Sequence, residues 1–499
     1  MHKKVILVID TGSSSIRGIL FDSRGTILYK QQLSNFMPIK DYEIAEQDSQ
    51  TFCSCLKKIC VSTVEFCARE EYSISALCFT SQRSSVLPLD EKGIPLSPIF
   101  MWYDKRSLPL CSEIIETYAN EIYSLCGLRL TPVLSAPKML WFKRSYPELY
   151  RKSYKLVGIH DYLLFLCTGN YVTDSSLASR TGLFDIVRME WSQKLINIFE
   201  IDAKMLCRII SPGDIAGHIT SSFSKETGIP EGLPVISCGG DQQCSQLGQG
   251  IFKEGDIGIT SGTASYTTTL VSAPIFDDKM RTNLSVSTLP GKYMLETSNM
   301  SSGSVYSWIR DTFYSSDTPF ERLDQDILSS PIGANNLIMI PDLAGKGCPQ
   351  WNSRVKGSFH NISFATKKQD FARAALEAIC AEIAECYSVL KEQTQLSDTV
   401  TSAGGLSRFS GFQQMLSDML SIPITSCYIE ETTALGAWAV ASPTVGFSQT
   451  AEDALLNYKN MHSEEIPIMA FYPNALHSKF YNEQAKIRLA LWESYCNEF

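Results

Sequence analysis

The sequence predicts an α/β protein of at least two domains, and three observations support this prediction. The chain has 499 residues, more than one hydrophobic core usually serves. Segments with strand patterning mix with helical segments throughout, which is typical of α/β proteins. A strand, a hydroxyl-rich turn and a second strand occur twice, at Val5–Asp22 and at Glu254–Leu270. Two such units indicate two related domains that face each other.

The first half is expected to open with a β-hairpin. Lys4–Asp10 and Arg17–Asp22 are largely apolar and flank the hydroxyl turn, and a third strand, Thr26–Leu33, follows the turn composition DSRG. The other elements expected in this half are helices at residues 49–70, 111–126 and 137–151 and a strand at Ser73–Thr80.

The boundary between the two domains is expected near Gly248–Glu254. This divides the chain into an N-terminal domain, residues 1–250, a C-terminal domain, residues 251–445, and a tail, residues 446–499. The tail has helical patterning and is expected to pack back on the domains. No low-complexity segment or long linker separates these parts.

Composition excludes several classes of function. The formal net charge is -9, which argues against a sequence-independent grip on nucleic acid. The 16 cysteines include no CxxC pair, so buried thiols in a reducing cytosol are expected rather than zinc or disulfides. The start has only five apolar residues before Asp10, and no apolar run reaches membrane-spanning length. A cytoplasmic protein without a membrane partner is expected.

The hydroxyl turns are suited to binding an anion. Backbone N–H groups of a tight Gly/Ser turn converge on one point, and an aspartate at a strand end can hold magnesium. The first turn supplies Asp10, Thr11, Gly12, Ser13, Ser14 and Arg17; the second supplies Ser261, Gly262 and Thr263. One such turn is most simply a polar hairpin turn, but two facing turns favour the phosphates of a nucleotide. GxxxxGK[ST] and GxGxxG patterns are absent, so another architecture must hold it.

Two glycine-rich strand ends carry further candidates. In Val235–Gly248 a strand delivers two glycines and Asp241 to a helix expected to start at Gln242. A helix N-terminus favours an ionised carboxylate, which can accept a proton from a hydroxyl group; the alternative is an ordinary N-cap. In the second glycine-rich stretch, a strand at Thr399–Ser402 leads into the sequence AGGLS. The glycines there either let a flat ring approach the backbone or form an ordinary βα turn.

Ordered motifs along nearly the whole chain resemble the FGGY carbohydrate kinase family, which includes xylulose, gluconate and glycerol kinases. The motifs are DTGSSSIRGILFD, EQD at Glu46–Asp48, the W-x-D-x-R of Trp102, Asp104 and Arg106, SAPKMLWFK at Ser135–Lys143, the stretch His160–Asp185, GGDQQ, ITSGTASY, the stretch Gly357–Ile379, and SAGGLS.

The resemblance implies two actin-like, ribonuclease H-like domains with an ATP cleft between them, and an ATP-dependent carbohydrate kinase that uses Mg²⁺. It implies Asp241 as the catalytic base and Asp10 as the metal ligand. The implied substrate-binding residues are Gln82, Arg83, Trp102, Asp104, Asp241 and Gln242. The implied ATP-binding residues are Thr11, Gly12, Ser13, Ser14, Arg17, Ser261, Gly262, Thr263, Gly404, Gly405 and Leu406.

Because the sequence departs from the family pattern at several positions, it does not identify the molecule that accepts the phosphoryl group. Ser84 stands where glycerol kinases have Glu, and Lys346–Gly347 replace the usual Glu-Arg. We expect a small sugar or polyol, with a pentulose such as xylulose preferred over glycerol, gluconate or a small signalling sugar. An alternative of a different class is an actin-like ATPase or nucleotide sensor without sugar transfer. Homodimers are common in the family, but no interface is readable from the sequence.

Overall fold

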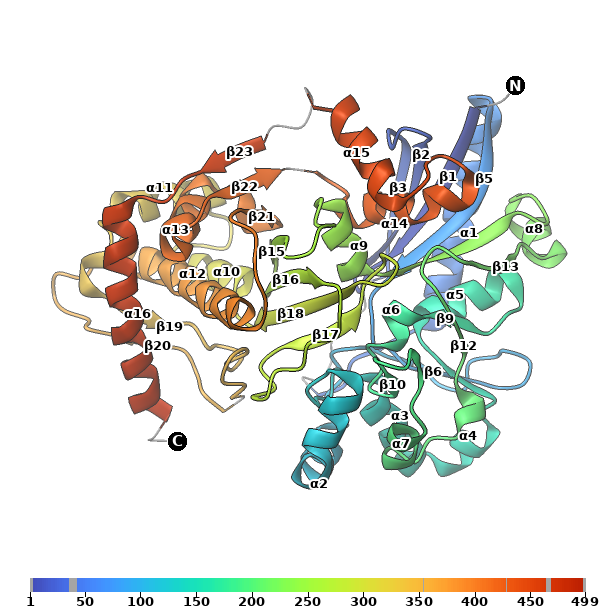
Figure 1. The fold of residues 1–499 in the computed structure, drawn as a ribbon, viewed down its shortest axis with the longest axis horizontal. Coiled ribbons are helices and arrows are strands. Elements are labelled where there is room, and N and C mark those ends of the chain that lie inside the picture. The colour runs from blue at the N-terminus through green and yellow to red at the C-terminus, as the bar shows by residue number, and fades with distance from the viewer. Residues whose placement is uncertain (1–2, 36–42, 353, 428, 464–467, 497–499) are drawn as a thin grey trace.

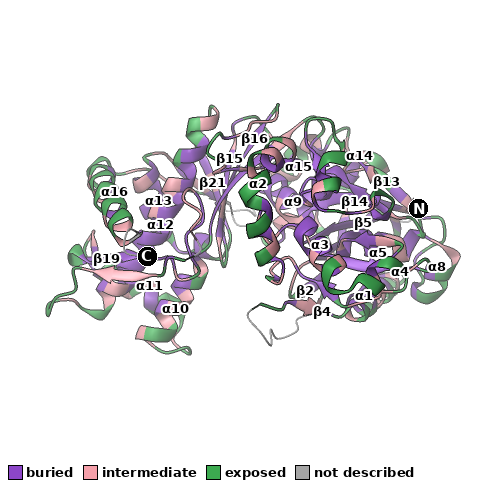
Figure 2. Ribbon diagram, turned by 90° about the horizontal axis from the view of Figure 1, so that it is seen from below, coloured by how far each residue is buried: buried purple, intermediate pink, exposed green. Residues whose placement is uncertain are grey.

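A computed structural model describes residues 3–35, 43–352, 354–427, 429–463 and 468–496. The chain forms two lobes, each built around one mixed β-sheet with helices on its faces (Figure 1). Buried residues run through both sheets, whereas the outer faces of the peripheral helices are exposed (Figure 2). Within the described residues, no helix is long and apolar enough to cross a membrane.

The N-terminal half contains the following elements. Its strands are β1 (Lys3–Thr11), β2 (Ser15–Asp22), β3 (Ile27–Ser34), β4 (Glu46–Gln47), β5 (Tyr72–Ser81), β6 (Leu87–Leu89), β7 (Ile99–Phe100), β8 (Lys155–Val157), β9 (Val172–Asp174), β10 (Phe184–Asp185), β11 (Glu190–Trp191), β12 (Arg208–Ile210), β13 (Ile215–His218) and β14 (Pro234–Gly240). Its helices are α1 (Ser49–Arg69), α2 (Leu108–Cys126), α3 (Ser135–Ser145), α4 (Pro147–Lys152), α5 (Ile159–Thr168), α6 (Ser175–Ala178), α7 (Gln193–Ile198), α8 (Ser221–Thr227) and α9 (Asp241–Gly248), with a 3₁₀ turn at Ala203–Met205.

The C-terminal half is built in the same way. Its strands are β15 (Ile257–Ser261), β16 (Ser265–Val271), β17 (Asn283–Val286), β18 (Tyr293–Asn299), β19 (Ile338–Ile340), β20 (Ser358–His360), β21 (Val400–Ala403), β22 (Ile424–Cys427) and β23 (Ile468–Phe471). Its helices are α10 (Gly303–Phe313), α11 (Phe320–Ser329), α12 (Lys368–Gln393), α13 (Ser410–Leu420), α14 (Thr432–Val445), α15 (Ala451–Met461) and α16 (Ala475–Cys496), with 3₁₀ turns at Ala334–Asn336 and Gly405–Arg408.

The two sheets share the topology of their core strands, β3-β2-β1-β5-β14 and β18-β16-β15-β21-β22. The first has the order β13-β14-β5-β1-β2-β3, and the second has the order β17-β18-β16-β15-β21-β22-β23. In both, the first strand pairs antiparallel with the next strand and parallel with a later one: β1 with β2 and β5, and β15 with β16 and β21. The hydroxyl turns therefore occupy equivalent places, at the carboxyl ends of β1 and β15, as the two sequence units indicated.

The segment after β22 crosses back to the first sheet. Helix α14 packs on β1, β5 and β14, and α15 packs on α14 (Figure 1). The Trp438 indole donates a hydrogen bond to the Asp22 carbonyl at 3.1 Å, and its ring lies 6.1 Å from that of Phe21. Helices α9 and α14 cross through Gly248 and Gly436, where a Cβ would lie only 1.9 Å from the opposing carbonyl oxygen. This close crossing ties the helix that begins at Asp241 to both halves.

Two expected elements differ from the structure. The helix expected at residues 137–151 is two helices, because Tyr146 leaves the helical conformation before Pro147 starts α4. The tail 446–499 was expected to be helical, but it also contains β23, which extends the second sheet by pairing with β22. Residues 464–467 and 497–499 of that tail lie outside the described residues. Fourteen cysteines, all except Cys427 and Cys496, are buried and free, as expected for a thiol-containing core.

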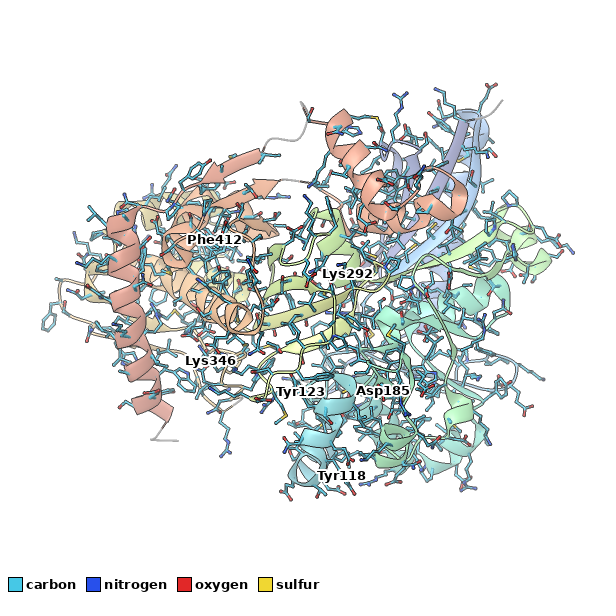
Figure 3. The ribbon with its side chains drawn as sticks, viewed as in Figure 1. Tyr118, Tyr123, Asp185, Lys292, Lys346 and Phe412 are labelled. Carbon is cyan, nitrogen blue, oxygen red and sulfur yellow. The ribbon has the colours of Figure 1, made fainter. Side chains whose placement is uncertain are left out.

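The halves also meet along the edge of the second sheet. The Tyr123 hydroxyl on α2, labelled in Figure 3, donates a hydrogen bond to the Thr282 carbonyl at 2.9 Å. The Val286 amide of β17 donates to Ser179 Oγ at 3.1 Å. The second sheet is thus anchored on α2 and α6, close to the carboxyl end of β14.

Candidate active site

The first hydroxyl turn, residues 12–14, joins β1 to β2 and is held through its carbonyl oxygens. Asn35 donates its side-chain amide to the Gly12 carbonyl at 3.1 Å, and Gln47 donates to the Ser13 carbonyl at 2.7 Å. Ser13 Oγ donates to Gln82 Oε1 at 3.1 Å and accepts the Trp102 indole N–H at 2.9 Å. The turn is therefore tied directly to two of the residues expected to bind substrate.

Asp10 lies at the end of β1, where it is only 6% exposed. Arg17, its partner across the hairpin, lies 3.6 Å from its carboxylate and 2.9 Å from that of Glu431. Burial raises the pKa of Asp10 to about 7; Arg17 opposes this shift, and the carboxylates of Asp241 and Glu431 add to it. Glu431 also pairs with Lys30, and Asp241 lies beside Arg83, so each of the three carboxylates has a cationic neighbour, and Asp10 shares its own, Arg17, with Glu431.

The second hydroxyl turn, Ser261–Thr263, joins β15 to β16 and rests on the start of α10. Gly303 and Ser304 donate their amides to the Gly262 and Thr263 carbonyls at 2.9 and 3.2 Å. Gly404 presses on the same turn from β21: its φ is +95°, and a Cβ there would lie 2.5 Å from the Ser261 carbonyl oxygen. The structure thus brings the two glycine-rich segments of the C-terminal half together.

Leu406 is placed differently from its expected neighbours. It is 5% exposed and belongs to the core of the C-terminal half, together with residues of β15, α12 and α13. Gly405 has open space where a side chain would project. Gly404 and Gly405 can therefore present backbone to a flat ring, whereas Leu406 mainly anchors this turn to the core.

Asp241 is the first residue of α9, and the N-cap is Gly240, so the alternative that Asp241 is an ordinary N-cap is not supported. Its side chain is 28% exposed and lies 3.7 Å from Arg83 Nε. Its Oδ1 accepts the Gln242 amide at 2.8 Å. Burial raises the pKa of Asp241 above its ordinary value, and the Arg83 guanidinium opposes the shift. Gln242 thus contacts the Asp241 carboxylate with its backbone N–H group.

A buried charge cluster around Arg83 was missed by sequence reasoning. Arg83 Nη2 lies 3.3 Å from Glu296 of β18, and Arg180 Nη1 lies 3.7 Å from the other oxygen of Glu296. The two arginines lower the pKa of Glu296 against the effect of burial. Tyr266 of β16 interacts electrostatically with the same charges. Tyr266 is flanked by Ser265 and Thr267 in the sequence, and Glu296 by Leu295 and Thr297, so no local pattern marks either residue as part of a site.

Asp104 is occupied by protein partners. It is 1% exposed, accepts hydrogen bonds from Arg106 at 2.8 to 3.1 Å, and accepts the Ala45 amide at 2.9 Å. These contacts favour a role in holding the loop that carries Trp102 over direct contact with a sugar.

The two sequence departures lie in different surroundings. Ser84 follows Arg83 in a left-handed conformation, with φ +68°, and its hydroxyl donates to the Arg180 carbonyl at 3.1 Å. Lys346, labelled in Figure 3, is buried in the C-terminal half, where it pairs with Glu382 and, at 2.8 Å, with Glu385 of α12. Ser84 therefore lies next to the charge cluster around Arg83, whereas the Lys346 side chain forms buried ion pairs inside the C-terminal half.

Two sheets whose core strands share one topology, each with a hydroxyl turn at the same strand end, define an actin-like, ribonuclease H-like pair of domains. Known proteins agree with this class. A family model described as the FGGY family of carbohydrate kinases, N-terminal domain, matches residues 5–248, and the corresponding C-terminal domain matches residues 258–444. The chain belongs to the FGGY family of carbohydrate kinases, which are ATP-dependent phosphotransferases acting on small sugars or polyols.

Individual relatives cover almost the whole chain. A gluconokinase of Bacillus subtilis is 28% identical over 448 residues, covering 87% of this chain and 86% of the relative. A xylulose kinase of Staphylococcus epidermidis is 25% identical over 498 residues, covering 99% and 97%. The solved structure of a ligand-bound xylulose kinase from Lactobacillus acidophilus has a TM-score of 0.92 at 22% identity and covers 99% of this chain and 98% of its own. That structural likeness supports the fold.

Proposed function

We propose that this carbohydrate kinase transfers the γ-phosphoryl group of ATP to a hydroxyl group of a pentulose such as xylulose, or of a related small polyol, with Asp241 as the general base. The observation that carries the proposal is the position of Asp241: it is partly exposed at the N-terminus of α9, beside Arg83 and within electrostatic reach of Asp10. Similarity to named xylulose kinases over 99% of the chain supports the pentulose, with gluconate and glycerol as alternatives.

Asp241 is suited to accept the proton of the attacking hydroxyl group. Phosphoryl transfer depends mainly on alignment and charge stabilisation, with little covalent help from the protein. The raised pKa of Asp241 brings its basicity closer to neutral pH while Arg83 keeps the ionised form accessible. Gln82 and Arg83 directly follow β5; Arg83 lies beside Asp241, and Gln82 and Trp102 both bond to Ser13. These three side chains are therefore the proposed sugar-orienting residues.

The two hydroxyl turns are the proposed phosphate sites. Ser13 and Ser14 at the end of β1, and Gly262 and Thr263 at the end of β15, present short polar residues at equivalent strand ends. Backbone N–H groups of such turns bind anions. The adenine ring is proposed to lie on Gly404 and Gly405, because the backbone there carries no side chain and touches the second turn.

Asp10 is the proposed ligand of Mg²⁺. The buried carboxylate fits a cation because it lies near the end of β1, just before the first hydroxyl turn, and shares the Arg17 guanidinium with Glu431. Within the described ranges no group of three or more His, Cys, Asp or Glu gathers as a metal site, so water and phosphate oxygens would supply the other ligands. When bound, the ion neutralises phosphate charge.

The test is ADP release by the purified protein with magnesium and ATP across a panel of acceptors. The panel contains xylulose, ribulose, xylitol, ribitol, erythritol, glycerol and gluconate. One acceptor is expected to raise ADP release far above the rate without sugar. A flat response with slow, sugar-independent ADP release would instead support the nucleotide sensor or ATPase.

A further inference from the structure

A buried chain of hydrogen bonds ends on the backbone that carries Asp241. It begins at Asp174, the N-cap of α6, whose Oδ1 accepts the Ser176 amide at 3.0 Å and the Ser176 hydroxyl at 2.6 Å. Ser176 Oγ in turn accepts the Gly240 amide at 3.1 Å. Asp174 and Ser176 are completely buried. The chain therefore joins α6 to the residue that directly precedes Asp241.

The direction of each hydrogen bond in the chain is determined. Ser176 has one hydroxyl proton, and the Asp174 carboxylate can only accept, so that proton goes to Asp174. The Ser176 lone pair then remains for the Gly240 N–H. Asp174 Oδ2 accepts the Ser237 hydroxyl at 2.5 Å, which leaves Ser237 Oγ to accept from His160 Nε2 at 2.8 Å. His160 thus carries a proton on Nε2, and because burial lowers its pKa to about 4, it is the neutral Nε2–H tautomer at neutral pH.

The contact between the Gly239–Gly240 backbone and Ser176 is close as well as polar. Gly239 has a φ of +101°, and a Cβ there would lie 2.8 Å from Ser176 Oγ and 2.7 Å from the Thr288 methyl group. The end of β14 therefore rests directly on Ser176. A shift of this backbone would move the start of α9 and the Asp241 carboxylate with it.

A second path returns from Asp241 to Ser176. Arg83, which lies 3.7 Å from Asp241, reaches Gln243 Oε1 at 3.5 Å, and Gln243 Nε2 donates to the Ser176 carbonyl at 3.3 Å. Ser176 thus makes two contacts near Asp241. Its hydroxyl accepts the Gly240 amide, and its carbonyl accepts a hydrogen bond from Gln243, which in turn contacts Arg83. The side chain of Ser175, one residue earlier on α6, makes none of these hydrogen bonds.

We propose that Ser176, oriented by Asp174, is a positioning residue that fixes the Asp241 carboxylate relative to the acceptor hydroxyl. This rests on the proposed function, in which Asp241 is the base. Loss of the Ser176 hydroxyl leaves the buried Gly240 N–H without its acceptor and loosens the start of α9. Because misplacement of a catalytic group by about 1 Å can reduce the rate roughly 100-fold, the effect falls on kcat, whereas ATP and sugar still bind.

The experiment compares Ser176→Ala with Ser175→Ala, each alone and combined with Asp241→Asn. In the wild-type background, Ser176→Ala is expected to lower kcat roughly 10- to 100-fold, with the KM values for sugar and ATP changed less than about threefold. Ser175→Ala is expected to leave kcat within about twofold. In the Asp241→Asn background, Ser176→Ala is expected to have no further effect, because a residue acting through Asp241 has nothing left to position.

The outcomes separate this inference from the proposed function. A fully additive loss in the double variant, or a rise in KM without loss of kcat, overturns the positioning role while leaving Asp241 as the base. Full activity of Asp241→Asn overturns the proposed function itself. If Ser176→Ala does not fold, as judged by its thermal unfolding, Ser176→Cys is used; its weaker acceptor is expected to give an intermediate kcat, and wild-type kcat would refute the role.

Discussion

The substitution Gly404→Ala tests whether the glycine turn after β21 sets the geometry of nucleotide binding. Gly404 has a φ of +95° and a ψ of −177°, a conformation that L-residues with a side chain rarely adopt. Forcing alanine into such a region costs about 1–3 kcal/mol. The added methyl group would also lie 2.5 Å from the Ser261 carbonyl oxygen, at the second hydroxyl turn.

The displacement can be worked out from that distance. Ordinary contact begins at 3.4 Å, so the two backbones must separate by roughly 0.9 Å (3.4 minus 2.5) to admit the methyl group. A displacement of this size in a binding loop can reduce the rate about 100-fold. Gly404→Ala is therefore expected to lower kcat/KM for ATP by roughly 10- to 100-fold, while KM for the sugar changes little.

Gly291→Ala is the matched control. Gly291, in the turn before β18, also has a left-handed φ, +68°, but no atom lies within 4 Å of an added Cβ, so alanine there adds backbone strain without displacing a neighbour. ATP titrations of sugar-dependent ADP release, with thermal unfolding of each variant, measure the effect. Wild-type kcat/KM for ATP in Gly404→Ala, or an equal loss in Gly291→Ala, would refute the proposed contact between this turn and the phosphate loop.

Three further outcomes are expected. Asp10→Ala should raise the magnesium concentration needed for half-maximal turnover, with partial recovery in excess magnesium; unchanged metal dependence in a titration would make Asp10 structural. Glu296→Gln leaves Arg83 and Arg180 without their shared carboxylate, so urea unfolding should show a loss of about 3–5 kcal/mol, and a loss below about 1 kcal/mol would contradict the buried pairing. His160 has a folded pKa lowered to about 4 by burial, below the ordinary 6.5, so the unfolded chain binds the proton more readily and the unfolding free energy should fall by up to ~3 kcal/mol as pH drops from 6.5 to 4. That dependence should weaken in His160→Gln; an identical pH profile would contradict it.

The local features of the fold could be predicted from the sequence because they follow from short-range chemistry. The first hairpin, expected at Lys4–Asp10 and Arg17–Asp22, is β1 and β2 with ends shifted by one or two residues. The apolar run before Asp10 becomes a strand buried between neighbours, as expected for the centre of a mixed sheet. Tyr146 and Pro147 show the limit of patterning, since the helical period continues across a residue pair that interrupts the helix.

Long-range placements could not be predicted. Helix α14 follows the last inner strand of the second sheet, yet it packs on the first sheet through Trp438. Its small apolar residues are buried on nearly every face of the helix, so the hydrophobic pattern of the sequence does not show which face packs against which sheet. Glu296 lies 213 residues from Arg83 in the sequence, and only the fold brings the two charges together. Asp241 was identified through a motif, whereas its support by Ser176 depends on backbone contacts that a sequence does not display.

The most direct test of the central claim compares wild-type protein with Asp241→Asn, and with Asp214→Asn as a control for loss of an exposed aspartate on a turn of the same half. Each is incubated with magnesium, ATP and the best acceptor of the panel, and both ADP and the sugar phosphate are measured. Wild type and Asp214→Asn are expected to form equal amounts of the two products. Asp241→Asn is expected to turn over more slowly by roughly two to four decades, with nucleotide affinity retained. Wild-type turnover in Asp241→Asn, or ADP formed without sugar phosphate by the unmodified chain, would contradict the proposed function.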